Sequence, residues 1–292
     1  MEASRATQIS PARWWTKETV AVVTGGNKGI GFEIVRQLAE EGLTVVLTSR
    51  DVCRGQAAVK SLRSIGCTGI LYHSLDVADP SSIRDFVSWL KTSLGGLDIL
   101  VNNAAVSFND IDENSVEHAE TVIATNFSGP KLLTESVLPL FRPPASSARI
   151  LNISSRLGLP NKLRNPALKR LLEDEERLSE VGIEEMVRTF LSHVKQGTWE
   201  EEGWPKVWTD YSVSKLALNA YSVLLARRLK DRGVGVNCFC PGYTITSMTK
   251  GRGVHTAAAA ARSAVRIVLL PPDGHPTGKF FIKDQPHHYC KL

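Results

Sequence analysis

Short apolar runs typical of β-strands alternate along the chain with longer segments of helical spacing. Between the first two runs, Ile34, Val35 and Leu38 fall on one helical face. Strands separated by helices pair in parallel, because each helix returns the chain to the same end of the sheet, and such crossovers are right-handed. The pattern predicts an α/β chain with a single Rossmann-type, doubly wound parallel sheet and helices on both faces. The expected strands are residues 20–24, 45–48, 69–74, 99–102, 150–154, 235–239 and 280–282.

One folded domain is expected at residues 19–283, because the sequence has no internal repeat, no low-complexity segment and no second core. Residues 1–18 form an N-terminal arm and residues 284–292 a C-terminal tail in this interpretation. Trp14 and Trp15 are poor choices for a fully solvated arm, so we expect them to dock on the domain. Residues 156–205 stand where a loop of a few residues is usual and predict an insertion with its own structure.

Composition excludes several classes of protein. With 292 residues, 42% hydrophobic and 22% charged, the chain has the composition of a folded globular protein. The net charge of +5 is spread without a Lys/Arg cluster, so a phosphate-bearing cofactor accounts for it and no nucleic-acid partner is expected. No apolar run reaches the ~20 residues of a membrane helix, and the polar start lacks a signal-peptide core, so we expect a cytoplasmic protein without a membrane partner. Five cysteines without CxxC spacing indicate reduced thiols, and the absence of HExxH or a Cys/His quartet predicts no metal site.

A glycine-rich segment follows the first expected strand and opens the first helix. Glycines allow a sharp turn and let a diphosphate approach the helix N-terminus, where unpaired N–H groups favour anions. A purely structural turn is the alternative, but the position between strand and helix favours a dinucleotide site. The expected cofactor contacts in this segment are Gly25, Asn27, Lys28, Gly29, Ile30 and Gly31.

The end of the second strand distinguishes the two nicotinamide dinucleotides. NAD sites place a carboxylate there for the ribose 2′-hydroxyl, whereas this chain has Ser49 followed by Arg50. Arg50 can bind a 2′-phosphate with charge-assisted hydrogen bonds, and Lys28 can add a second positive charge. The sequence therefore predicts NADPH/NADP as the cofactor, unless both residues are ordinary solvated charges.

Tyr211 and Lys215 are four residues apart, which places both on one face of a helix. A free phenol has a pKa of about 10 and is a slow acid near neutrality. An ammonium group ~5 Å away favours the phenolate by about 3 kcal/mol, or roughly two pKa units. We therefore expect Lys215 to bring the pKa of Tyr211 toward the range of a general acid.

These motifs stand in the order and spacing of the short-chain dehydrogenase/reductase family, which the chain resembles over about residues 19–283. The segments TGGNKGIG, RDVCRGQAAV, EEGWP and LLPPD resemble the monomeric carbonyl reductase branch, and plant menthone/neomenthol and salutaridine-type ketone reductases are similar. Ala105 departs from the glycine usual in the family. The other shared motifs are Asp76-Val77, Asn102-Asn103-Ala104-Ala105, Asn126, Ile153-Ser154-Ser155, Tyr211 with Lys215, and Pro241-Gly242.

The resemblance implies a role for each matching residue. Ser155 holds the substrate carbonyl oxygen, Tyr211 donates the proton, and Lys215 lowers the Tyr211 pKa and binds the nicotinamide ribose. Asn126 bends its helix and tethers a water that links Lys215 to solvent. The remaining cofactor contacts are Asp76 and Val77 at the adenine, Asn103 beside the ribose, and Thr244 and Thr246 at the carboxamide. Ser154 and Ser155 are neighbours on a strand and face opposite sides, and the family pattern selects Ser155.

The helical stripe inside the insertion bears on assembly. Its apolar residues share one face and must be buried, and the insertion returns just before the Tyr211 helix, which belongs to the usual dimer face of the family. We therefore expect the insertion to cover that face and leave a monomer. A mobile lid over the substrate is the alternative. The stripe consists of Ile183, Met186, Val187, Phe190, Leu191 and Val194.

The expected activity is NADPH-dependent reduction of a hydrophobic ketone or aldehyde. Two alternatives remain open at this point: a cofactor-binding regulator without turnover, and alcohol oxidation with NADP. The identity of the small-molecule carbonyl substrate does not follow from the sequence.

Overall fold

The computed structural model describes residues 13–108 and 114–289. One sheet of eight strands has the order β3-β2-β1-β4-β5-β6-β7-β8, and all neighbours are parallel except the antiparallel pair β7 and β8. The chain crosses over between β1 and β4, where the strand order reverses, as in a doubly wound sheet. The strands are β1 (Val20–Val23), β2 (Thr44–Ser49), β3 (Ile70–Ser74), β4 (Ile99–Asn102), β5 (Arg149–Ile153), β6 (Gly235–Cys240), β7 (Lys279–Ile282) and β8 (Gln285–His287). This confirms the predicted fold class and the seven predicted strands.

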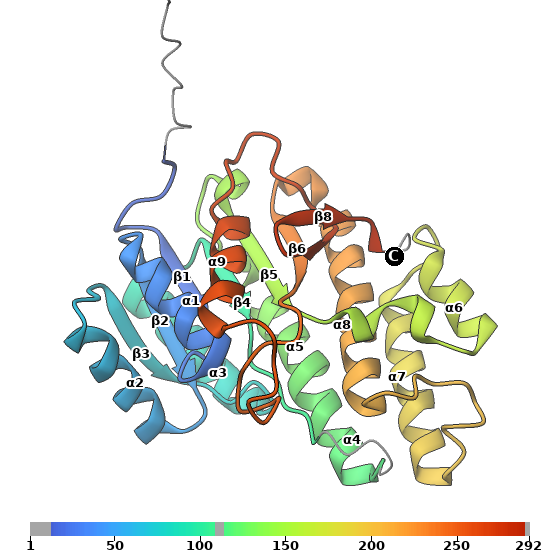
Figure 1. The fold of residues 1–292 in the computed structure, drawn as a ribbon. Helices are drawn as coiled ribbons and strands as arrows, with labels where there is room; N and C mark the ends of the chain where they lie inside the picture. Colours follow the sequence, from blue (N-terminus) through green and yellow to red (C-terminus); the bar gives the residue numbers. More distant parts are fainter. Residues whose placement is uncertain (1–12, 109–113, 290–292) are drawn as a thin grey trace, which may run out of the picture.

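Helices cover both faces of the sheet (Figure 1). One apolar core lies between the sheet and α1, α2 and α9, and a larger core lies between the sheet and α3, α4, α5 and α8. The inner strands β1, β2, β4, β5 and β6 are almost continuously buried, because helices pack on both of their faces. The helix bounds are α1 (Gly29–Glu40), α2 (Val52–Ser64), α3 (Pro80–Leu94), α4 (Val116–Ile123), α5 (Gly129–Val137), α8 (Thr209–Arg228) and α9 (Ala257–Val268).

The insertion at residues 156–205 has its own secondary structure. Two short 3-10 turns lead to α6 (Pro166–Glu173) and then to α7 (Glu180–Gln196). α7 packs on α8 and α4. The predicted stripe is buried against these helices, with Leu191 partly buried at its edge. The segment is therefore part of the larger core.

Both ends of the described chain belong to the folded unit. β8 and the buried Tyr289 lie beyond the boundary expected at residue 283, so the prediction of a C-terminal tail at 284–292 is wrong for residues 284–289. Trp14 docks as expected, since its Nε1 donates to the Leu269 carbonyl at 3.1 Å and its ring packs on the smaller core. Trp15 packs beside it, with ring centroids 5.9 Å apart.

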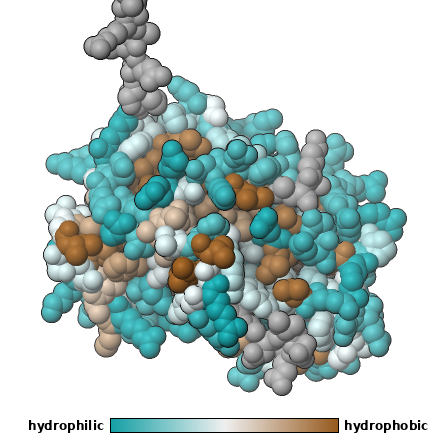
Figure 2. All heavy atoms as spheres, viewed as in Figure 1, coloured by the Kyte–Doolittle hydropathy of each residue, from teal (hydrophilic) through white to brown (hydrophobic). Residues whose placement is uncertain are grey.

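The surface in Figure 2 is mostly hydrophilic, with apolar residues in several separate spots. Within residues 13–108 and 114–289, no helix combines the length and apolar character needed to cross a bilayer. Cys53, Cys67, Cys238 and Cys240 are free thiols, whereas Cys290 lies outside the described residues.

Candidate active site

A cavity of about 730 Å³ opens at the carboxyl ends of the central strands. This is the edge at which doubly wound sheets bind ligands, because the loops diverge at the crossover point. The structure places Gly31 and Asn126 outside the lining, directly behind it. The predicted residues that line the cavity are Gly25, Asn27, Lys28, Gly29, Ile30, Arg50, Asp76, Val77, Asn103, Ser155, Tyr211, Lys215, Thr244 and Thr246.

The glycine loop is closely packed against the end of β4. Gly25 has a φ of 63°, and a Cβ there would lie 3.0 Å from the Ala104 Cα. A Cβ on Gly31 would collide with the Asn103 amide and the Gly25 carbonyl. α1 begins at Gly29 without a side-chain cap, so its first N–H groups remain available at the cavity.

Asn103 fixes this loop. Its Nδ2 donates to the carbonyl oxygens of Thr24 at 2.9 Å and Gly25 at 3.2 Å. The Thr24 hydroxyl in turn accepts from the backbone N–H groups of Asn103 and Ala104, both at 2.9 Å. Asn103, which the family resemblance places beside the cofactor ribose, therefore also links the glycine loop to the end of β4.

Three cations gather at one end of the cavity: Arg50, Lys28 and Arg54. Arg54 did not emerge from the sequence analysis, although it follows Arg50 at a spacing of four residues, which was an available signal. Asp51 lies between them, but its carboxylate accepts from the Arg54 N–H at 2.9 Å and pairs with the Arg54 guanidinium at 3.2 Å. The Asp51 carboxylate is thus already bound by the first turn of α2 and by the Arg54 guanidinium.

Asp76 and Val77 follow β3 and line the cavity at the same end as the three cations. The Asp76 carboxylate accepts from the Ala78 N–H at 2.9 Å, and its backbone N–H donates to the Ser82 hydroxyl at 3.0 Å. Val77 is buried. These contacts order the loop as a side wall of the cavity.

The two adjacent serines face opposite sides. The Ser154 hydroxyl is buried and donates to the Asn219 Oδ1 at 2.5 Å, inside the protein. The Ser155 Oγ accepts from the Leu157 N–H at 3.1 Å, and the hydroxyl acts on the Tyr211 phenol by lowering its pKa. Of the two serines, Ser155 is therefore the one whose hydroxyl acts on Tyr211.

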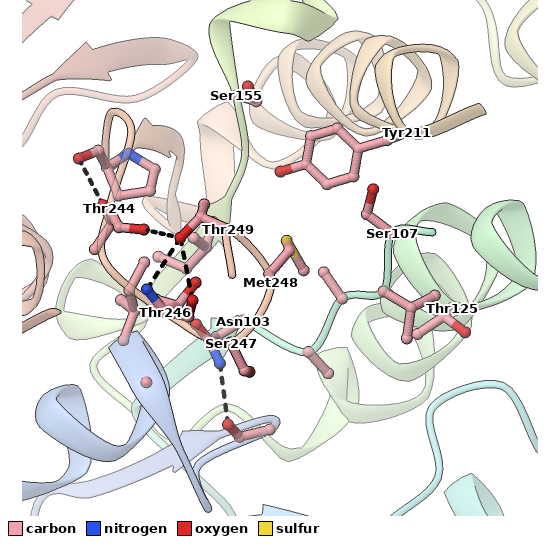
Figure 3. A pocket seen from close by; sticks show the side chains of 18 of the residues that line it. Asn103, Ser107, Thr125, Ser155, Tyr211, Thr244, Thr246, Ser247, Met248 and Thr249 are labelled. Carbon is pink, nitrogen blue, oxygen red and sulfur yellow. Dashed lines mark hydrogen bonds between the residues drawn. The ribbon is translucent and has the colours of Figure 1, made fainter. Parts of the chain in front are cut away.

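Tyr211 and Lys215 lie on α8, one turn apart. Figure 3 shows the Tyr211 hydroxyl directed into the cavity, with Ser155 and Ser107 on opposite sides of its ring. The Lys215 Nζ lies 5.5 Å from the centre of the Tyr211 ring and donates to the Ile153 carbonyl at 2.9 Å. The structure thus brings the three predicted groups Ser155, Tyr211 and Lys215 together.

Burial controls the ionisation of this pair. It raises the pKa of Tyr211 above that of free tyrosine, while the Ser155 hydroxyl acts in the opposite direction. It also lowers the pKa of Lys215 to about 8. The expectation that the Tyr211 pKa is brought toward neutrality is therefore wrong for the protein alone, because burial disfavours the charged phenolate.

Asn126 lies next to α8, in a π-helical turn, Ala124–Ser128, between α4 and α5. Its Oδ1 accepts from the Val106 N–H at 2.8 Å, and its Nδ2 donates to the Val106 carbonyl at 2.9 Å and the Ser214 hydroxyl at 3.1 Å. Asn126 thus ties the loop after β4 to α8. The expected bend of its helix and the expected water relay stay predictions.

The loop after β6 closes the other side. The Thr249 hydroxyl bonds with the Thr244 carbonyl at 2.7 Å and the Thr246 carbonyl at 3.1 Å, which shapes the turn in Figure 3. Met248 from this turn points toward Tyr211 in the same view. Several apolar residues around Tyr211 carried no sequence signal, because the fold alone brings them together. They are Val106, Phe108, Leu157, Val207, Trp208, Tyr243 and Met248.

Three kinds of comparison agree with this geometry. The family model of the short chain dehydrogenases matches residues 19–167 and 201–256, and the gap between them falls within the insertion. The chain is 40% identical to (+)-neomenthol dehydrogenase from Arabidopsis thaliana, over 91% of this chain and 96% of that protein. It is 36% identical to carbonyl reductase (NADPH) 3 from Mus musculus, over 91% of this chain and 96% of that protein.

Among solved structures, that of salutaridine reductase from Papaver somniferum superposes with a TM-score of 0.85. It is 37% identical to this chain, and the match covers 90% of this chain and 99% of that one. Both the family model and the relatives span most of the molecule, including the glycine loop and the Tyr211 helix. The chain therefore belongs to the short-chain dehydrogenase family of oxidoreductases.

Proposed function

We propose that the protein reduces a hydrophobic ketone or aldehyde to an alcohol with NADPH. The observation that carries the proposal is the single cavity in which Tyr211, Ser155 and Lys215 meet the glycine loop and three cations. The name of the relative from Mus musculus, carbonyl reductase (NADPH) 3, supports the same cofactor. The apolar residues around Tyr211 favour a substrate with few polar groups.

The residues present fit a phosphorylated dinucleotide. The glycine loop has no room for Cβ atoms against β4, and the uncapped start of α1 offers N–H groups to a diphosphate. Arg50, Lys28 and Arg54 supply positive charge where a 2′-phosphate would bind. When bound, NADPH supplies the hydride.

The protein's part of the reaction is to hold the carbonyl oxygen and give it a proton. Tyr211 retains its proton at neutral pH because burial raises its pKa, so it can act as the donor. The Ser155 oxygen accepts from the Leu157 N–H, and its hydroxyl hydrogen can be donated to the carbonyl oxygen when a substrate binds beside Tyr211. Lys215, still mostly charged below about pH 8, stabilises the negative charge that develops on Tyr211.

A carbonyl panel with NADPH tests the proposal. We expect oxidation of NADPH, followed by its absorbance, with at least one monoterpenone, quinone, aromatic aldehyde or alkaloid ketone. Tyr211→Phe is the matched control, because it keeps the ring and removes the proton donor: turnover should nearly vanish while NADPH affinity stays within a few-fold. Tight NADPH binding without turnover on any carbonyl would instead favour a regulator, and near-normal activity of Tyr211→Phe would refute the mechanism.

A further inference from the structure

Trp208 has a backbone conformation that bulky residues rarely adopt. Its φ of 48° and ψ of 60° lie in the left-handed region, where a Cβ is unfavourable and glycine or asparagine is usual. Across residues 13–108 and 114–289, the other non-glycine residues with positive φ are Lys250 and Lys283, both exposed in turns. Trp208 differs from them because it is half-buried and lines the cavity.

Trp208 also occupies a helix start that a capping residue would stabilise. Most α-helices of the described chain begin at a Ser, Thr, Asp or Asn whose side chain accepts a backbone hydrogen bond. α5 lacks such a cap because it continues the π turn, and α1 lacks one at the glycine loop. α8 is the remaining exception, with Trp208 at its N-cap. At this position the chain therefore has neither a side-chain N-cap nor a favourable backbone conformation.

The position of the ring indicates what this residue does instead. The Trp208 ring lies 6.1 Å from the Tyr211 ring, and the two planes stand at 84°. The indole therefore stands beside the phenol at nearly a right angle instead of stacking over it, and it forms part of the cavity wall next to Tyr211. Strained residues that the surrounding structure holds in place often serve a site, and this one adjoins the proposed proton donor.

We propose that Trp208 determines substrate shape: it admits flat carbonyl compounds to Tyr211 and Ser155 and excludes cage-shaped ones of similar size. A flat molecule can lie along the indole and keep contact over its whole face. A globular molecule touches a flat wall at few atoms and needs more room between Trp208 and the residues opposite. This inference rests on the proposed function and adds the substrate class.

Two ketones with equal numbers of carbon atoms, planar 1-tetralone and cage-shaped 2-adamantanone, test it. We expect the wild-type protein to have the higher kcat/KM with 1-tetralone. Trp208→Ala should shift the ratio of the two values toward 2-adamantanone by about tenfold or more, the scale on which pocket shape discriminates substrates. Trp199→Ala removes a half-buried tryptophan that lies outside the cavity and should leave the ratio unchanged, and the KM for NADPH should stay the same in both variants.

Thermal melting checks the backbone argument separately. Trp208→Gly removes the ring and tolerates the left-handed backbone, so it should melt at a higher temperature than Trp208→Ala. The opposite order would overturn the inference, as would an equal loss of kcat/KM for both ketones in Trp208→Ala. If the wild-type protein reduces both ketones and Trp208→Ala leaves the ratio of their kcat/KM values unchanged, only this inference fails. If it reduces no carbonyl compound at all, the proposed function fails first.

Discussion

Of the two residues Tyr211 and Lys215 that we propose as catalytic, Lys215 has the pKa nearer to neutrality, because burial lowers it to about 8 and raises that of Tyr211. In the reductive direction both groups must be protonated, Tyr211 as donor and Lys215 as the charge that stabilises the phenolate. As pH rises, Lys215 loses its proton first. We therefore expect the loss of its charge to set the alkaline limit of reduction.

We expect kcat/KM for ketone reduction to be constant below neutrality and to fall as pH rises through about 8, the value to which burial lowers the pKa of Lys215. The measurement is a pH profile of initial rates at low ketone and saturating NADPH. Lys215→Arg keeps the charge at all these pH values, so any residual activity of that variant should lack the fall. A wild-type profile that stays flat to pH 10 would contradict the assignment.

Cofactor choice is expected to depend on Arg50. Replacing it with glutamate exchanges charge-assisted hydrogen bonds of ~1.5 to 3 kcal/mol for repulsion, so the preference for NADPH over NADH should fall by at least ~10-fold. The ratio of kcat/KM values for the two cofactors measures it. Lys60→Glu makes the same charge change on exposed α2 surface outside the cavity and should leave the ratio unchanged. An unchanged ratio in Arg50→Glu would shift the role to Lys28 or Arg54.

Most of the candidate site could be predicted residue by residue, because the motifs that recur in the family lie at strand ends that the fold must bring together. The place of Arg54 in the site could have been predicted from its spacing of four residues from Arg50. Trp208 and Met248 were not, because their position beside Tyr211 depends on a left-handed backbone and on a loop turn. The Tyr211 pKa was predicted in the wrong direction, because burial cannot be read from the spacing of two residues.

Among the secondary-structure elements, the strands inside the sheet could be predicted from the sequence, whereas the edge strand β8 could not. Five of the seven expected strands, β1, β2, β4, β5 and β6, are almost fully buried because helices cover both of their faces, and such strands leave a clear signal. β8 has three residues, includes Pro286 and stands at the sheet edge, where proline is tolerated and alternation is weak. The π turn at Asn126 carries no periodicity of its own, since it shifts a helix by one residue.

Substitutions on α7 can test whether this helix is packed as part of the larger core. Phe190 is fully buried on the stripe and meets the Trp204 ring at 5.2 Å. Phe190→Ala should lower the free energy of unfolding by about 3–5 kcal/mol, because it leaves a cavity in the larger core. Val181→Ala on the same helix, where the side chain is 69% exposed, should change it by less than about 0.5 kcal/mol. Urea denaturation compares the two, and equal effects would mean that α7 is a mobile lid rather than part of the core.

Ion pairs also hold α7 to the helices beneath it. The Lys131 ammonium on α5 lies 2.6 Å from the Glu180 carboxylate and also pairs with Glu184. Arg228 at the end of α8 lies 3.6 Å from Glu180 and 2.5 Å from Glu135 on α5. These contacts form a connected network across three helices, so the insertion has one defined position on the molecule.

That position is the basis of a prediction for the whole molecule. In the family, the Tyr211 helix and the helix before it form the usual dimer face, and here α7 packs on α8 and α4. The stripe on α7 is buried within the chain, whereas its outer side carries charged residues such as Glu185 and Arg188, which pair with each other at 2.6 Å. A second subunit would therefore meet a charged helix instead of the apolar patch that a stable interface needs. On the face of the molecule that Figure 2 shows, the apolar residues lie in separate spots. We expect a monomer, and light scattering coupled to gel filtration at micromolar concentration should give a mass near 32.0 kDa. A mass of about twice that value that persists on dilution would show that pairing occurs despite the insertion.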